Sequence, residues 1–568
     1  MLETLLFVVL VSLLSIIIGL VLLLFFKKTK PILINEQQLV LTFFLGIVIV
    51  SMLASWINLF LPLHIISFSP FFLLAIITLL LKRKHFLWKS DLDLKAIKYE
   101  GIVFIITLIL FIQLGSLTPY MADTQIYHLQ IVRWYQNYKT IPGLANLFPR
   151  YGFYSNWFHL ISTYSLPSSH GNLLYVNTTI SIWFTFFILT KIAAFKASHV
   201  TEKKFFTIFY ITIFLFLFFG WNLLRGNCRS LGNDFIVTLL VLYILLAITE
   251  SRILNKSVSV NKNVLIFLTL SVPFFKLTGL FVLPLLLIYF IQTKQGFKTY
   301  RYSASIALLF IIPFCIKNYI QSGYLLFPYT SLDLFSPDWK LPLPLAQRFQ
   351  EFITLSNKYI YEGVPVNAWN QSSFKWLNTW FLKLALYDKV LLILLLFSWP
   401  LVFYYTRLTN HFLKRNIGYL LAIVPIIIIW FFTSPDPRFL YGFIVFSTFY
   451  TITAILLPYI KKDAVQVVQK MAFIAIFLFS IYKICLFEGS LLNAYIPKKH
   501  AYEKIEINNN TFYLTKKSSV SDLSECVDLP IPCIYSSNPY LQMRSADFEK
   551  GFRMNKSLDS TFISNYIY

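Results

Sequence analysis

Asp123 is the residue of this 568-residue sequence whose type and position best suit chemistry. It follows an apolar run centred near residue 110 and begins a stretch with helical spacing. One face of that stretch would carry Asp123, Tyr127, Gln130 and Trp134. Ionisable groups beside membrane-spanning runs are costly and usually functional, so we expect Asp123 to be a general base. The alternative is that Asp123 only caps the helix that begins there.

A cation in a rigid turn is the second candidate. Arg438 lies in the motif Ser-Pro-Asp-Pro-Arg-Phe at 434–439, where two prolines fix the directions of Asp436 and Arg438. A guanidinium in such a turn suits bidentate phosphate binding. A local pair between Asp436 and Arg438, or a lipid-headgroup anchor, is the alternative.

Three more cations lie beside or within apolar runs. Lys276 interrupts an apolar stretch and must therefore snorkel, pair with an acid or face a wet cavity. Arg225 and Lys317 lie at the ends of two other runs and add positive charge to connecting loops. We expect these cations to bind an anionic substrate group, with structural pairing as the alternative.

The elements that must position these residues are membrane helices. The chain is 57% hydrophobic and 13% charged, whereas soluble chains are roughly 45–50% apolar and about a quarter charged. Apolar runs recur along nearly the whole sequence, which predicts an all-α polytopic membrane protein with the lipid bilayer as its partner. The net charge of +24 is explained by basic clusters beside helix ends, so nucleic acid is not an expected partner.

The basic clusters also predict the topology. Placing them in the cytoplasm gives 14 membrane-spanning helices, within a range of 12–14, and puts both termini outside. One stretch decides the count, because residues 264–292 could form one long helix or two short ones joined near Pro273 and Lys276. Two helices keep the next basic cluster inside, so we expect two.

The long polar connections then lie outside the cytoplasm. We divide the chain into a three-helix module at 1–100, a membrane core at 101–487 and an external tail at 488–568. The core carries two large external loops, at 118–172 and 320–387.

The first of these loops resembles the GT-C superfamily of membrane glycosyltransferases. The resemblance rests on an acidic residue, Asp123, that begins a surface helix in a large external loop with Tyr127 and His128 beside it. In that superfamily the acidic loop usually follows the first helix, whereas here it follows the fourth apolar run. The first three runs would then form an additional module.

The chain is also similar to an uncharacterised family of bacterial polytopic membrane proteins. This second likeness covers most of the chain. The motifs that carry it are Asp123–Arg150, KNYIQSGYLLFP at Lys317–Pro328, SPDPRF at Ser434–Phe439, and the tail around Cys526, Pro532 and Cys533.

The GT-C resemblance implies sugar transfer from a polyprenyl-phosphate donor to a glycan or lipid acceptor of the cell envelope. It would occur on the outer face of a bacterial inner membrane. Asp123 would be the base, Tyr127, His128 and Trp134 would shape the sugar pocket, and the cations would hold the phosphate. The alternatives are an O-antigen polymerase or ligase and a non-enzymatic flippase or transporter of lipid-linked glycan.

No cofactor is certain. His128 and His159 could join Asp123 in binding a divalent metal, so we leave that cofactor open. Asp91-Leu-Asp93 matches the DxD motif of soluble-fold glycosyltransferases, but its short loop leaves no room for a nucleotide-binding domain.

Two cysteines of the polar tail are a candidate disulfide. Cys526 and Cys533 flank a segment with two prolines, and an external tail is where disulfides persist. Closing so short a loop would stabilise the tail by about 2–3 kcal/mol. We expect local rigidity from this bond and catalysis that survives its loss.

The topology predicts how a single cysteine near residue 125 reacts with an impermeant thiol reagent. It should be labelled in intact cells, because loop 118–172 is expected outside. Labelling only after permeabilisation would contradict the topology.

Overall fold

The computed structural model describes most of the 568 residues. The ranges outside the description are 27–31, 91–96, 120, 166–174, 197–199, 255–260, 295, 360–373, 408–410, 488–501, 509, 516–525, 527–528, 535–537, 556 and 566–568. Asp91 and Asp93 of the DxD motif therefore lie outside the described residues, as does part of each large loop.

Each of the fourteen apolar runs of the sequence falls on a helix. These helices are α1 (Leu2–Phe26), α2 (Glu36–Ile57), α3 (Ile65–Leu81), α4 (Lys98–Gly115), α7 (Tyr175–Lys196), α8 (Thr201–Phe219), α9 (Asn233–Ile253), α10 (Lys262–Phe275), α11 (Leu283–Thr293), α12 (Phe297–Ser322), α15 (Leu386–Arg407), α16 (His411–Thr433), α17 (Tyr441–Leu456) and α18 (Lys462–Cys485). Among the described residues, nine helices are long and apolar enough to cross a bilayer. The all-α membrane class is confirmed, while the count of fourteen spans stays a prediction.

Ion pairs and hydrogen bonds tie one set of helix ends together. Lys196 at the end of α7 pairs with Glu100 at the start of α4, with Nζ and Oε1 2.6 Å apart. Lys191 bonds Glu250 at the end of α9 at 2.6 Å, and Arg252 donates to the carbonyl of Arg415 at the start of α16. We call this set of helix ends the basic end.

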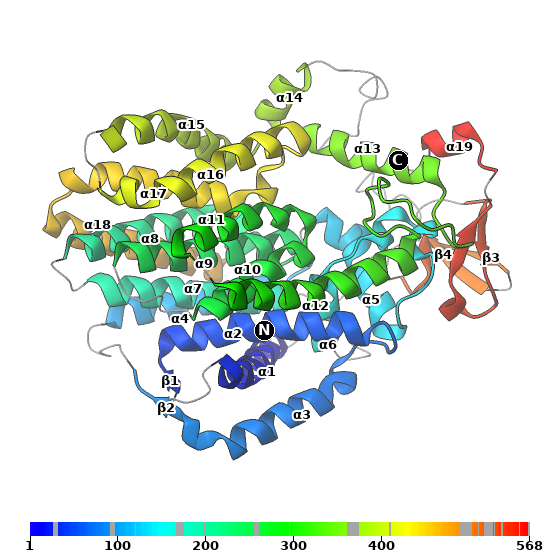
Figure 1. Ribbon diagram of the computed structural model, residues 1–568, viewed down its shortest axis with the longest axis horizontal. Coiled ribbons are helices and arrows are strands. Elements are labelled where there is room, and N and C mark those ends of the chain that lie inside the picture. Colours follow the sequence, from blue (N-terminus) through cyan, green and yellow to red (C-terminus); the bar gives the residue numbers. More distant parts are fainter. Residues whose placement is uncertain are drawn as a thin grey trace.

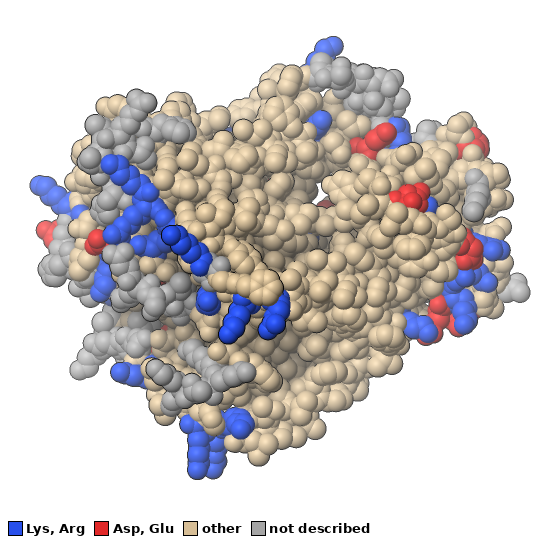
Figure 2. Space-filling view, viewed as in Figure 1, with Lys and Arg blue, Asp and Glu red and all other residues tan. Residues whose placement is uncertain are grey.

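The opposite helix ends also meet one another, at what we call the loop end. Lys317 near the end of α12 donates to Asn58 after α2, and Asn233 at the start of α9 donates to the carbonyl of Phe275 at the end of α10. Consecutive membrane helices therefore alternate in direction. Lys and Arg predominate at the basic end, and they mix with Asp and Glu where β3 and β4 lie (Figures 1 and 2).

The ambiguous stretch 264–292 forms two helices, as expected. α10 ends at Phe275, Lys276 has an extended backbone, and a 3₁₀ turn, η7 (Leu277–Val282), leads into α11. The chain reverses closely, because a Cβ on Gly279 would lie 2.6 Å from the carbonyl oxygen of Val272. Lys276 is thus held at the tip of a helical hairpin at the loop end.

Glycines allow α1 and α2 to touch backbone to backbone. A Cβ on Gly19 would lie 1.9 Å from the carbonyl oxygen of Thr42, and one on Gly46 would lie 1.8 Å from that of Ser15. Such small-residue contacts drive helix association in lipid, where burial of apolar surface gives little. Near the basic end, β1 (Ile32–Ile34) pairs in parallel with β2 (Phe86–Trp88).

Short helices cover the loop end. They are η2 (Thr124–His128), α5 (Leu129–Asn137), η3 (Leu144–Asn146), η4 (Pro149–Gly152), α6 (Asn156–Tyr164), α13 (Leu343–Lys358) and α14 (Trp376–Lys383). α13 is amphipathic, with Leu345 and Phe349 buried on one face.

The tail forms a small β domain that packs on α5 (Figure 1). Its elements are β3 (Tyr502–Ile507), β4 (Asn510–Thr515), β5 (Cys533–Ile534), β6 (Leu541–Met543), β7 (Phe552–Met554) and α19 (Ser560–Asn565). β3 and β4 are antiparallel, β5 pairs in parallel with β4, and β6 pairs with β7. A disulfide joins Cys526 and Cys533, whose Cα atoms are 6.0 Å apart.

The disulfide loop bonds directly to α5. The amide of Gln130 donates to the carbonyls of Cys526 and Leu529, at 2.7 and 2.9 Å. Arg133 donates to Leu529 at 2.6 Å. The tail is therefore coupled to the helix that comes after Asp123, which the sequence did not indicate.

Replacing both Cys526 and Cys533 with serine should loosen α5 as well as the tail. The expected loss is about 2–3 kcal/mol of local stability, because the unfolded loop gains conformational freedom. Hydrogen exchange measured by mass spectrometry should become faster in residues 129–137. Cys485→Ser, at an exposed free thiol, is the control, and unchanged exchange in α5 would contradict the coupling.

Candidate functional site

A cavity of about 830 Å³ opens at the loop end between the short helices and the ends of α9, α10, α12 and α15. Its walls are largely apolar and aromatic, with three carboxylates and four cations among the described lining residues. Six of these seven charged residues form ion pairs with one another: Asp123, Arg150, Asp234, Lys276, Asp436 and Arg438. A concave, mostly apolar pocket with a few convergent polar groups is the usual form of a ligand site.

Asp123 faces this cavity from the start of η2, which is a π-helical turn. Its backbone is helical and its side chain makes no capping hydrogen bond, so the capping alternative does not describe it. The carboxylate instead accepts a hydrogen bond from Nη1 of Arg150 at 2.9 Å. The Arg150 guanidinium also lies over the ring of Tyr127, with Cζ 5.2 Å from the ring centroid.

Opposing effects set the ionisation of Asp123. Burial alone would raise its pKa, but the positive charge of Arg150, with further contributions from Arg438 and Lys276, outweighs burial. The pKa of Asp123 lies below its ordinary value, so the side chain is a carboxylate at neutral pH.

Tyr127 and His128 line the cavity beside Asp123. Burial, together with the charge of Asp123, raises the pKa of Tyr127, so the phenol stays protonated. Burial lowers the pKa of His128 to about 3, which keeps the imidazole neutral. Its Nδ1 is buried and has no hydrogen-bond partner in the described part of the chain.

Lys276, at the tip of the helical hairpin, pairs with Asp234 in the first turn of α9. Its ammonium also lies 3.8 Å from the ring centroid of Phe439, a close cation–π contact. Both side chains are partly exposed to the cavity, at 24% for Lys276 and 22% for Asp234. An ammonium has three N–H donors, so Lys276 can bond a ligand while it keeps Asp234.

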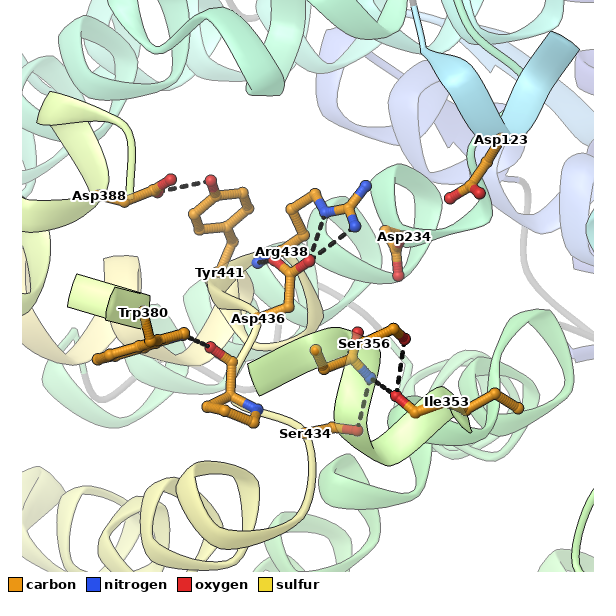
Figure 3. A network of polar contacts seen from close by, with 12 residues as sticks. Asp123, Asp234, Ile353, Ser356, Trp380, Asp388, Ser434, Asp436, Arg438 and Tyr441 are labelled. Carbon is orange, nitrogen blue, oxygen red and sulfur yellow. Dashed lines mark hydrogen bonds and ion pairs between the residues drawn. The ribbon is translucent and has the colours of Figure 1, made fainter. Parts of the chain in front are cut away.

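Arg438 is held by its own turn. Asp436 accepts from the backbone N–H of Arg438 at 3.0 Å and from Nε and Nη2 at 2.9 and 2.7 Å. The charge of Asp436 raises the pKa of Arg438 well above its ordinary value, so the guanidinium is permanently charged. Figure 3 shows that the guanidinium extends toward the space between Asp123 and Asp234.

Two indoles fix the backbone of that turn. Trp380 of α14 donates to the carbonyl of Pro435 at 2.7 Å (Figure 3). Trp430 of α16 donates to that of Asp436 at 2.8 Å. The amide of Asn357 in α13 donates to the hydroxyl of Ser434 at 3.0 Å. The local pair between Asp436 and Arg438 therefore exists, and it aims the remaining N–H groups of Arg438 at the cavity.

The structure thus brings together Asp123, Tyr127, His128, Lys276, Asp436 and Arg438. It does not bring Trp134, Arg225 or Lys317 to the cavity. Trp134 is buried against Phe548 and Phe552 of the tail, with ring centroids 6.3 and 5.9 Å apart. Its place in a sugar pocket is therefore not supported.

Arg225 and Lys317 have structural partners instead. Arg225 donates to the carbonyls of Phe218 and Phe219, the last two residues of α8, at 2.6 and 2.7 Å, which satisfies open carbonyls of that helix. Lys317 is fully buried and lies 2.8 Å from Asn58 Oδ1 and 2.7 Å from His159 Nε2. Neither cation can reach an anion in the cavity from these positions.

A metal site of Asp123, His128 and His159 does not fit this geometry. His159 is committed through both ring nitrogens, to the carbonyl of Ser155 and to Lys317. Among the described residues, no three His, Cys, Asp or Glu side chains lie close enough to hold a metal ion. The charged groups that the described cavity lining presents are carboxylates and organic cations.

Arg150, Asp234 and Lys383 are the charged lining residues that the sequence did not single out. Arg150 ends the stretch Asp123–Arg150, which is one of the motifs that carry the family resemblance. Its position in that motif is the feature of the sequence that could have identified it as a site residue. Asp234 precedes an apolar run, and a carboxylate in that position normally indicates only a favourable first turn of a helix.

The comparisons place this site in a protein family. A family model described as "Domain of unknown function (DUF8201)" matches residues 1–445. The chain belongs to this family. The matched range contains every cavity residue named above and ends within α17, so that α18 and the tail lie beyond it. No curated protein and no solved structure matches the chain.

Replacing Arg150 with methionine should raise the pKa of Asp123. Arg150 is the strongest of the charges that lower this pKa, so its removal takes away the largest effect that opposes burial. Infrared spectra across a pH series can follow the C=O band of the protonated carboxyl, with Asp123→Asn identifying the band. Arg553→Met, at a half-exposed arginine of β7, should leave the titration unchanged. A midpoint that does not move upward in Arg150→Met would show that another group holds the carboxylate.

Proposed function

We propose that the protein is an inverting membrane glycosyltransferase that moves a sugar from a polyprenyl-phosphate donor to an envelope glycan or lipid acceptor. The observation that supports this most directly is the convergence of Asp123, Lys276 and Arg438 on one cavity. A scaffold has no need for a carboxylate and two cations on the same cavity surface, and a flippase would use the cations for the lipid phosphate but would not need a base for an acceptor. An inverting transfer needs both, a base for the acceptor and positive charge for the leaving phosphate.

In the proposed step, an acceptor hydroxyl attacks the anomeric carbon of the donor sugar. The new C–O bond forms as the bond between that carbon and the phosphate oxygen breaks, and its electron pair leaves on the phosphate. The hydroxyl proton passes to Asp123, which is ionised at neutral pH and can therefore accept it. Because the pKa of Asp123 is low, proton transfer would come late, when the hydroxyl has become strongly acidic.

The leaving phosphate would lie against Lys276 and Arg438. The Arg438 guanidinium is fixed by Asp436 and by the two indoles, so little conformational freedom is lost when it binds an anion. The ammonium of Lys276 is positioned by Phe439. Preorganised cations in a site with mostly apolar walls stabilise developing negative charge more strongly than cations in water.

Aromatic and apolar walls would accommodate the rest of the donor. Tyr127, Phe153 and Trp221 line the cavity near Asp123 and offer faces for a sugar ring. Phe352 and Ile353 of α13 line another wall and suit an isoprenoid chain. Figure 2 shows a hollow in the flank of the molecule, where a lipid tail could enter from the side.

The proposal includes the finer architecture and location. The fourteen helices α1–α4, α7–α12 and α15–α18 would all cross the inner membrane of a bacterium, in a GT-C-like arrangement. The loop end, with the cavity and both termini, would face outward. The alternation of the helices and the basic clusters at the other end support this orientation.

The central test is Asp123→Asn, which removes the base and keeps its shape. Surface glycans should lose the product that depends on the wild-type protein, with activity reduced by about 10²–10⁴-fold, while the amount of protein in the membrane stays the same. Mass spectrometry of glycans measures the first quantity and immunoblotting the second.

The matched control is Asp333→Asn. Asp333 also pairs with a lysine, Lys340, but does not line the cavity, so its replacement should leave the glycans unchanged. Wild-type glycan output from Asp123→Asn would overturn the assignment of the base. Glycans that are identical with and without the wild-type protein would overturn the proposed function itself.

A further inference from the structure

We propose that Asp234 makes the cavity discriminate against the product of the proposed reaction, by disfavouring a phosphate monoester relative to a phosphate diester. This inference rests on the proposed function and concerns a residue that the transfer step does not use. It assigns Asp234 a role in ligand selection and product release.

The ion pairs of the two cations that would hold the phosphate differ in how firmly they are anchored. Asp436 is 7% exposed and holds Arg438 through three hydrogen bonds, one of them from the backbone. Asp234 is more exposed, and its hydrogen bond within the described part of the chain is to Lys276 alone. The Asp234–Lys276 pair is therefore easier for a ligand to rearrange than the Asp436–Arg438 pair.

An anion bound by Lys276 would lie beside Asp234. The ammonium keeps its contact with Phe439 and has donors for two oxygen partners. Arg438 extends toward the same space (Figure 3). An anion at this place would be attracted by Lys276 and Arg438 and repelled by Asp234, whose carboxylate is held near the first turn of α9.

The charge of the lining matches a monoanion. Four cations, Arg150, Lys276, Lys383 and Arg438, face the carboxylates of Asp123, Asp234 and Asp436, so the described lining carries one net positive charge. A polyprenyl-phosphate sugar is a phosphodiester with one negative charge. The product of transfer is a phosphate monoester, which carries close to two negative charges at neutral pH because its second pKa is about 6.

The second charge of the product would be repelled by Asp234. At a few ångströms, two like charges in a partly buried site repel strongly enough to change an affinity by tenfold or more. Because the repulsion is proportional to charge, Asp234 would weaken binding of the monoester about twice as much, in free energy, as binding of the diester. This favours departure of the spent carrier and binding of a fresh donor.

The test compares two ligands that differ in one charge. Farnesyl phosphate and its methyl diester are titrated into the full-length detergent-solubilised protein at pH 7.5 by calorimetry. Wild-type protein should bind the diester more tightly than the monoester. Asp234→Asn should bind the monoester about tenfold more tightly than wild type does, a gain of about 1.4 kcal/mol, and the diester, with half the charge, only about threefold more tightly.

Each outcome decides a different question. Equal gains for both ligands, or no gain for the monoester, would overturn the role of Asp234. Asp234→Ser repeats the measurement if the asparagine variant does not fold, and retained diester binding shows that a variant is folded. Asp333→Asn should change neither affinity, and a monoester gain there would also count against a local effect. If wild-type protein binds neither ligand, the proposed function fails instead.

Discussion

The pairing of charged groups inside a low-dielectric helix bundle is the constraint on which the rest of this structure depends. An isolated buried charge costs several kcal/mol, so each cation within the bundle needs a partner. At the basic end, Lys191 and Lys196 reach the glutamates of other helices. At the loop end, pairing gathers residues from η2, η4, α9, the α10–α11 turn and the α16–α17 turn around one cavity. The same requirement therefore sets both the helix packing and the composition of the candidate site.

The helices could be predicted from the sequence because their signal is local. Apolar runs of spanning length and the basic clusters between them indicate both the elements and their alternation. The same pattern indicates the hairpin at Lys276. A single helix over residues 264–292 would have placed the next basic cluster outside the cytoplasm and inverted the topology after it. Backbone contact between α1 and α2 could not be predicted in this way, because Gly19 and Gly46 act through a pairing that only the tertiary structure defines.

The site was predicted in part, and a π-helical turn accounts for one error. Regular α-helical spacing puts Asp123, Tyr127, Gln130 and Trp134 on one face. The turn η2 at Thr124–His128 has the wider i→i+5 pattern and shifts the register of α5. Asp123 and Tyr127 consequently face the cavity, whereas Gln130 and Trp134 face the tail. Arg150 and Asp234 were missed because their roles depend on ion pairs with residues that are distant in sequence, Asp123 and Lys276.

That change of register connects the tail to the helix that follows Asp123. α5 presents its second face to the disulfide loop, where Gln130 and Arg133 bond the carbonyls of Cys526 and Leu529. The tail also holds the segment that leads from α5 toward Arg150, through the backbone bond from Phe552 to Pro142 at 3.0 Å. Asp123 and Arg150 thus both lie in segments whose backbone is held in place by hydrogen bonds to the tail. A carboxylate whose ionisation depends on a cation 2.9 Å away requires such support, because a shift of either segment would alter the electrostatic environment of Asp123 without any change in the cavity residues themselves.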